Sequence, residues 1–378
     1  MAIGAIVQAS ASSVTVFVIG RTISGLASGV ATAMPNGYIS EIAPPHIRTK
    51  LGVGFQLAMA TSLILVSTAF FFANTASGWR YIAGFPAVLA LIFAVAAPKC
   101  MVESPTWLLG KGRQADAERE IAKLFGHENV GLALSWMQPQ RTGTPTTTKM
   151  QQADADAVEV SPSSSTIVEN PWKALFSPAY RQQTMLAIMM TFAMQFSGIN
   201  AVFMYSSSMF SEAGVSDGRV GTIIVNTVNL LPSFGAGWLA SRYGNRSLLL
   251  MGQSLMIACA VGLTVALLAN VPELSIAFIA LYVAVFAVTL GSLAFVVVAD
   301  VFPDELRASG GSVALFANWV GTLVIGVGYP YVADALGDLG FLPFIAAMAF
   351  FTLFMFKFLP ETSRKTSDEI QALFRKRE

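Results

Sequence analysis

The stretch AMQFSGINAVFMYSSSMF, Ala193–Phe210, lies inside a long apolar run and yet carries polar side chains at Gln195, Ser197 and Asn200. A helix that faced only lipid would leave these groups without hydrogen-bond partners, which is costly in a hydrocarbon environment. The stretch is therefore predicted to be a membrane-spanning helix that lines the inside of a helical bundle. Gly198, between the two amide side chains, is expected to bend or break this helix.

The composition of the whole chain agrees with a membrane protein. Of its 378 residues 54% are hydrophobic and 12% are charged, whereas a soluble domain has about 25% charged residues. Runs of about 20 apolar residues are long enough to cross a bilayer. We therefore predict an all-α integral membrane protein with nine spans, at 14–38, 49–73, 81–101, 183–207, 219–240, 247–270, 274–299, 309–333 and 339–359.

Lysine and arginine residues predict the orientation of these spans, because cytoplasmic loops are enriched in both. If the spans alternate in direction, the basic loops and the basic C-terminal tail all fall on one side of the membrane. The opposite side has only Arg80 and Arg219. The 102–182 loop and the C-terminus are thus predicted to be cytoplasmic. The net charge of +1 gives no reason to expect a nucleic-acid partner.

Two pairs of matching segments indicate an internal repeat. SEIAPPHIR (40–48) resembles ADVFPDELR (299–307), and Glu103 and Glu361 begin similar charged segments 258 residues apart. Transporters often consist of duplicated halves. The repeat predicts six spans in each half, with the first two spans and most of the third absent from the first half.

The predicted domains follow from this repeat. Residues 1–101 form the remainder of the first transmembrane half, 102–182 the cytoplasmic loop, 183–360 the second half, and 361–378 a cytoplasmic tail. Within the loop, 112–126 reads as a short amphipathic helix. The Ser-, Thr- and Pro-rich part that follows it is predicted to be a disordered linker, whose hydroxyls are also candidates for phosphorylation.

Uncharged polar residues recur inside several spans, among them Gln56, Asn226 and Asn318. These residues can either form hydrogen bonds between helices or line a cavity. Amide groups donate to and accept from hydroxyls, and aromatic rings cover the apolar face of a sugar, so a cavity of this kind suits a neutral polyhydroxyl ligand. Arg21, inside the first full span, is either a functional residue or an anchor that reaches toward the membrane surface.

Several motifs resemble those of one family, the sugar-porter branch of the major facilitator superfamily, which includes facilitative glucose transporters and proton-coupled relatives. QFSGINAVFMYSSSMF resembles its seventh span, and VESPTWLLGKGR its Pro-Glu-Ser-Pro-Arg-Trp-Leu signature. The segments GRTISGLASGVATAMPNGYISEIAPPHIR, DVFPDELRASG and LPETSRKTSDEI also match, in the order and spacing of the family.

The resemblance implies a fold of two six-helix halves, a sugar site at the midplane and alternating access. By resemblance, the sugar-binding residues are Gln56, Gln195, Asn200, Asn226, Phe295, Asn318 and Trp319. The residues of gating or coupling are Arg21, Tyr205, Glu41, Arg48, Glu103, Arg242, Arg246, Asp300, Arg307 and Glu361, the charged residues among them, apart from Arg21, forming ion pairs at the cytoplasmic mouth.

The chain departs from the family pattern at the predicted site. Met194 stands where a second glutamine is expected, which removes one amide. In the tenth span the usual Gly-Pro-x-Pro-Trp is GSLAF, 291–295, and the loss of both prolines is expected to remove a flexible break. Both changes put glucose specificity in doubt.

Three functions are compatible with these observations. The leading one is transport of a hexose such as glucose through the plasma membrane, by uniport or by proton symport. The alternatives are a transporter-like sugar sensor, which the short tail disfavours, and an inactive fragment. An enzyme is not expected, because the sequence has no metal-binding cluster and no nucleophile–base pair, and no cofactor or oligomeric partner is implied.

Overall fold

The computed structural model describes residues 1–73, 75–137, 171–212, 218–363, 365 and 367–375, and all regular structure in these ranges is helical. The first part of the chain forms α1 (Ala2–Ala9), α2 (Val14–Ile42), α3 (Pro45–Phe72) and α4 (Gly78–Cys100). Short helices follow: α5 (Pro105–Gly110), α6 (Gln114–Phe125), η1 (His127–Asn129), α7 (Val130–Met137) and α8 (Pro171–Leu175). The second part forms α9 (Arg181–Phe196), α10 (Ile199–Glu212), α11 (Gly218–Tyr243), α12 (Asn245–Leu268), α13 (Pro272–Val288), α14 (Leu290–Val301), α15 (Asp304–Leu336), η2 (Gly337–Leu339), α16 (Leu342–Phe358) and α17 (Ser367–Arg375).

The nine predicted spans are confirmed as helices. Among the described residues, seven helical segments are long and apolar enough to cross a membrane, and two shorter apolar helices lie at Leu57–Phe72 and Leu342–Phe358. The amphipathic helix predicted within 112–126 is present as α6. The Ser-, Thr- and Pro-rich segment lies outside the described residues. The domain boundaries stay a prediction.

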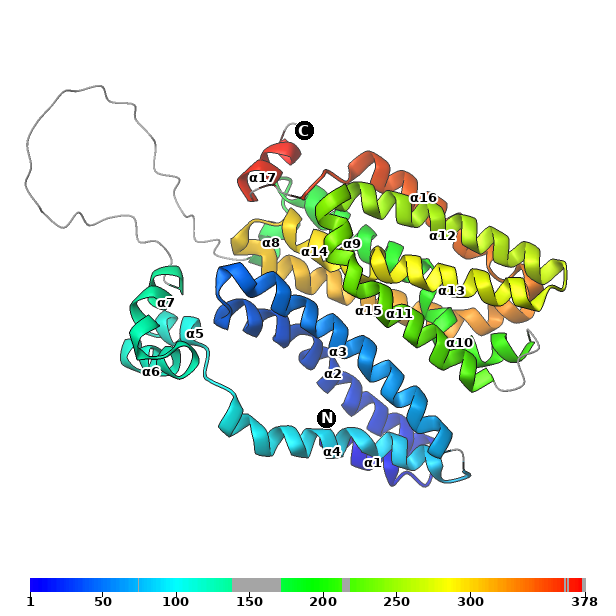
Figure 1. Cartoon of the computed structure of the whole chain (residues 1–378), viewed down its shortest axis with the longest axis horizontal. Helices are drawn as coiled ribbons and strands as arrows, with labels where there is room; N and C mark the ends of the chain where they lie inside the picture. Colours follow the sequence, from blue (N-terminus) through cyan, green and yellow to red (C-terminus); the bar gives the residue numbers. More distant parts are fainter. Residues whose placement is uncertain (74, 138–170, 213–217, 364, 366, 376–378) are drawn as a thin grey trace, which may run out of the picture.

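The spanning helices run along one common direction and fall into two groups, α1–α4 and α9–α16 (Figure 1). Helices α5–α8 and α17 all lie at one end of the bundle, which we call the proximal end. The C-terminal ends of α3 and α10 and the N-terminal ends of α4 and α11 lie at the opposite, distal end. These helices, among them the amphipathic α6 and α17, thus gather at the end that the lysines and arginines predict to be cytoplasmic.

The packed core lies in the second group of helices. In the span 181–205, 61% of the residues in its most apolar stretch are buried, compared with 6% in the span 14–32. One cluster of buried side chains extends from Leu175 to Phe374. The C-terminal helix α17 joins this cluster through Ile370 and Phe374. The second half therefore provides the rigid frame on which a site can be positioned.

The predicted bend at Gly198 is confirmed. Helix α9 ends at Phe196, α10 begins at Ile199, and Gly198 between them has φ +84°. This left-handed conformation disfavours residues with a Cβ atom. The space is also closed, because a Cβ at Gly198 would lie 2.8 Å from the ring of Phe344 on α16.

The expectation of an unbroken tenth span is wrong. Thr289, with φ −110° and ψ −97°, interrupts it between α13 and α14 although no proline is present. A Cβ on Gly252 of α12 would lie 2.3 Å from Cγ2 of Thr289, so the glycine accommodates the irregular residue. The hydroxyl of Ser292 donates to the carbonyl of Ala287 at 2.6 Å and satisfies an acceptor that the break exposes. Packing and a hydroxyl group produce the break here.

A test of the bend is the change Gly198→Ala. The left-handed backbone and the contact with Phe344 are expected to lower the stability of the detergent-solubilised protein by about 2–4 kcal/mol. The matched control is Gly237→Ala on α11, where a Cβ meets no atom within 4 Å. Thermal unfolding should show a lower midpoint for Gly198→Ala and an equal or higher midpoint for the control. Equal midpoints for both variants would contradict the argument.

Candidate functional site

Three amide side chains meet at the bend between α9 and α10. The Nε2 of Gln195 donates to Oδ1 of Asn318 on α15 at 2.5 Å. The Nδ2 of Asn200 donates in turn to Oε1 of Gln195. Gln195 and Asn318 are buried, and Asn200 is partly buried. We call these three residues the amide triad. Each Asn keeps one polar atom, Asn200 Oδ1 and Asn318 Nδ2, outside this chain of hydrogen bonds.

Two glycines allow the triad to form. Gln195 and Asn200 are five residues apart, and a straight helix would place them on different faces. The bend at Gly198 turns α10 so that the two side chains meet. A Cβ at Gly321 would lie 2.9 Å from the Cβ of Gln195, so α15 approaches α9 closely only because residue 321 is a glycine.

A tyrosine that the sequence analysis did not single out supports the bend. The hydroxyl of Tyr282, on α13, donates to the backbone carbonyl of Ser197, which lies next to the bend. Tyr282 is 2% exposed. A buried tyrosine hydroxyl usually has a hydrogen-bond partner. A tyrosine in the middle of an apolar run was therefore the feature of the sequence that could have pointed to this contact. Its partner could be identified only from the tertiary structure.

The other predicted sugar contacts are distributed around this centre. Asn226, on α11, is buried against the first half, where it donates to Oγ of Ser67 at 2.7 Å. Phe295 on α14 is partly buried, and Trp319, next to Asn318 on α15, is 46% exposed. The side chain of Gln56 lies outside the described residues. The structure thus brings together Gln195, Asn200 and Asn318 and places Asn226 elsewhere.

Tyr205 lies on α10, distal to the triad. Its hydroxyl donates to the carbonyl of Gly326 on α15 at 3.1 Å. Its ring centroid lies 5.1 Å from that of Tyr329, which stacks on Phe344. These rings connect α10, α15 and α16 on the distal side of the bend. The role of Tyr205 in an outer gate stays a prediction.

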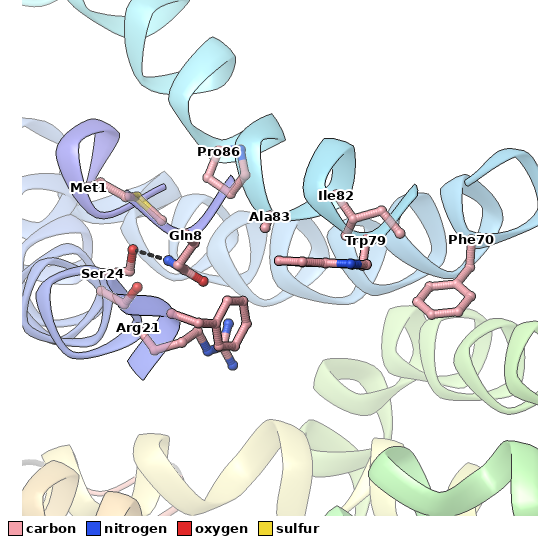
Figure 2. Close-up of a pocket in the computed structure, with 11 residues that line it drawn as sticks. Met1, Gln8, Arg21, Ser24, Phe70, Trp79, Ile82, Ala83 and Pro86 are labelled. Atoms are coloured by element: carbon pink, nitrogen blue, oxygen red, sulfur yellow. Dashed lines mark hydrogen bonds between the residues drawn. The ribbon is translucent and has the colours of Figure 1, made fainter. Parts of the chain in front are cut away.

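Arg21 faces a cavity of about 470 Å³ in the first half. Figure 2 shows its side chain near Gln8 and Ser24, with Trp79 on the neighbouring helix α4. Gln8 donates to Ser24 Oγ at 2.7 Å and to the carbonyl of Gly20 at 3.2 Å, which joins α1 to α2. An arginine beside polar groups and an indole fits a functional residue better than a surface anchor, and its role stays a prediction.

The proximal end shows the internal repeat as matching pairs of a carboxylate and a hydroxyl residue. In the first half, Oγ of Ser104 donates to the carboxylate of Glu41 at 2.6 Å. In the second half, Thr362 lies beside Asp300, and its hydroxyl accepts from Nδ2 of Asn245 at 2.9 Å. The two carboxylates are 259 residues apart and the two hydroxyls 258 residues apart. The duplicated sequence therefore produces the same carboxylate–hydroxyl pair in each half.

Within the second half, Glu361 contacts backbone groups. Its carboxylate accepts from the amides of Asn245 at 2.9 Å and Arg246 at 3.2 Å, at the start of α12. A carboxylate there satisfies free N–H groups and the helix dipole. Arg246 donates to the carbonyl of Phe356 at 2.8 Å, and Arg242 lies over the ring of Trp238.

The remaining charged residues have local partners or lie outside the description. Glu103 lies 4.0 Å from Arg113, and Arg307 donates to the carbonyl of Ala299 at 3.0 Å. The side chain of Arg48 is outside the described residues. In the state described, the contacts that we see for these charges lie within one half. Their predicted role in holding the halves together stays a prediction.

The fold and the site define a class: a membrane carrier of two helical halves, with a polar centre on bent helices. The chain matches the profile of the family "Sugar (and other) transporter" over residues 1–374. It belongs to this family, the sugar porters of the major facilitator superfamily, and is therefore a transporter and not an enzyme.

Individual relatives agree. The chain is 32% identical over 376 residues to facilitated glucose transporter member 4 of Bos taurus, a match that covers 97% of the chain and 69% of that protein. It is also 32% identical over 367 residues to member 2 of Rattus norvegicus, covering 95% of the chain and 66% of that protein.

Solved structures share the fold. The proton:xylose symporter XylE bound to 6-bromo-6-deoxy-D-glucose is 25% identical with a TM-score of 0.73, covering 98% of the chain and 80% of XylE. The inward-open structure of XylE from E. coli, at 24% identity, has a TM-score of 0.76 over the same shares of the two chains. The predicted fold class is therefore confirmed.

The hydroxyl of Tyr282 provides a test of how the site is supported. Tyr282→Phe keeps the ring and leaves the carbonyl of Ser197 without this donor, which is expected to cost about 1–3 kcal/mol of stability. Tyr331→Phe is the control, because Tyr331 is 74% exposed. Thermal unfolding in detergent should show a lower midpoint for Tyr282→Phe alone. An unchanged midpoint would show that the bend does not depend on this bond.

Proposed function

We propose that the chain carries a monosaccharide, a hexose such as glucose, across the membrane by alternating access, and that it binds the sugar at the amide triad. The observation that carries this proposal is the triad itself, a buried set of amides on a bent helix. Membership of a sugar-transporter family and the names of the relatives support it.

The chemistry of the triad suits a sugar. The hydrogen bonds within the triad do not use the donor Asn318 Nδ2 or the acceptor Asn200 Oδ1. Asn318 can therefore donate to one sugar hydroxyl, and Asn200 can accept from another. Trp319 follows Asn318 in sequence and has an exposed ring that can cover an apolar sugar face. Because Met194 replaces an amide, the sugar is held by fewer hydrogen bonds on this helix than the family pattern implies.

Two modes of coupling are open, uniport and proton symport. The relative XylE is a proton:xylose symporter, whereas the mammalian relatives are facilitated transporters. Arg21 is our candidate for a residue of coupling, because it is a cation inside a span that faces a cavity with polar side chains at Gln8, Ser24 and Ser28. We also propose that the protein lies in the plasma membrane with its proximal end in the cytoplasm, which the basic loops support.

A sugar sensor is the second candidate function. A sensor would bind sugar at the same triad without moving it across the membrane. Measurement of binding and uptake on the same purified protein separates the two functions. Binding with no uptake would favour the sensor.

The principal test is uptake of radiolabelled hexose by proteoliposomes that contain the purified chain, with and without a protonophore. Gln195→Ala removes both the donor to Asn318 and the acceptor of Asn200, so the sugar affinity is expected to fall about ten-fold. A protonophore should abolish uptake driven by a proton gradient if the chain is a symporter and leave uptake unchanged if it is a uniporter.

The control for this test is Gln114→Ala on the surface helix α6, whose amide contacts Glu118 outside the bundle. It should leave affinity and uptake unchanged. Absence of uptake and binding by the parent chain would contradict the proposed function. An unchanged affinity in Gln195→Ala would contradict the assignment of the site.

A further inference from the structure

Asn226 joins the two halves of the molecule. Its Nδ2 donates to Oγ of Ser67 at 2.7 Å and lies 3.5 Å from the carbonyl of Leu63, both on α3. Asn226 itself is on α11 and is 5% exposed. Helix α3 belongs to the first half and α11 to the second, and the two helices pack together (Figure 1).

A second contact lies on the same seam, closer to the distal end. The guanidinium of Arg219 lies over the ring of Phe71 with 5.0 Å between Cζ and the ring centroid. Arg219 precedes Asn226 on α11, and Phe71 follows Ser67 on α3. This is the order expected for two antiparallel helices, so both pairs belong to one interface.

Both contacts are of kinds that hold surfaces together and release them reversibly. A hydrogen bond between neutral side chains contributes modestly because each partner can bind other groups when the surfaces separate. A cation–π contact behaves in the same way and strengthens where water is excluded. Together they favour a closed distal end without locking it.

We propose that Ser67, Phe71, Arg219 and Asn226 form a clamp that holds the distal end of the two halves closed and sets the balance between the two access states. The proposal rests on the proposed transport function, because a clamp of this kind matters only if the halves separate. We call the four residues the distal clamp.

The clamp also gives Asn226 a specific task. The amide that the family resemblance assigns to sugar binding has its nitrogen committed to α3 in the closed arrangement. A sugar that enters from the distal side therefore finds this donor free only when the halves are apart. When they close, α3 replaces the sugar as the acceptor, so Asn226 exchanges partners between the ligand and the opposite half.

The first test changes the α3 side of the clamp and leaves Asn226 intact. Ser67→Ala with Phe71→Leu removes the hydrogen bond to Ser67 and the cation–π contact and leaves only the 3.5 Å contact of Asn226 with the backbone carbonyl of Leu63. Ser62→Ala with Phe72→Leu is the matched control on the same helix. Ser62 and Phe72 are exposed, and Ser62 bonds only within α3 among the contacts described. Each pair is made in a Cys100→Ser background with spin labels at Thr75→Cys and Glu273→Cys, one at the distal end of each half.

The expected result is a longer distance between the labels in the clamp variant, with the ratio of open to closed molecules raised on the order of ten-fold. The control should match the parent distribution. Identical distributions in all three proteins, with thermal midpoints that show each is folded, would overturn the proposal. This readout needs no sugar, so it is distinct from failure of the transport function, which would appear as absent uptake with the distance shift intact.

A second test applies even if the double variant does not fold. Ser67→Cys with Asn226→Cys in the Cys100→Ser background places two thiols where the hydrogen bond now is. Oxidation should cross-link the two thiols and stop uptake. Reduction should then restore uptake to the rate of the same variant that was never oxidised. Failure to cross-link in a folded protein, or a cross-link with no effect on uptake, would overturn the clamp.

Discussion

The requirement that every backbone polar group in a membrane find an internal partner determines how this bundle can depart from straight helices. An interruption such as the one at Gly198 or Thr289 exposes carbonyls, and each needs a donor. At the first interruption Tyr282 donates to the carbonyl of Ser197. At the second Ser292 donates to the carbonyl of Ala287. At both interruptions a side-chain hydroxyl thus supplies a donor, from another helix at Gly198 and from the same span at Thr289.

This requirement explains why the polar centre is in the second half. Tyr282 lies on α13, and the core that fixes it extends through α9 to α16. Gly252 leaves room for the irregular residue Thr289, and Gly321 lets α15 approach Gln195 closely. Once the bend at Gly198 is fixed, Gln195 and Asn200 meet Asn318 without further strain. The site follows from the way the bend is supported.

The sequence alone predicted the features that depend on local chemistry. The nine spans follow from runs of apolar residues, and the bend follows from a glycine between two amides. The interruption at Thr289 could not be predicted, because it arises from a threonine that packs against a glycine 37 positions earlier in the chain. The partners of Glu361 were beyond prediction for the same reason, since backbone amides of α12 compete with arginines for its carboxylate.

The matching pairs at the proximal end show how a duplicated sequence can serve two states. Ser104 donates to Glu41, and Thr362 lies beside Asp300 at the equivalent place of the second half. A carboxylate that already accepts one hydrogen bond within its own half keeps lone pairs for an arginine of the other half. Such a residue does not lose all its partners when the halves separate at this end, so opening costs less than the rupture of an isolated buried ion pair. The hydroxyl of Ser104 therefore leaves Glu41 with a partner whether or not the predicted ion pair at this mouth is formed.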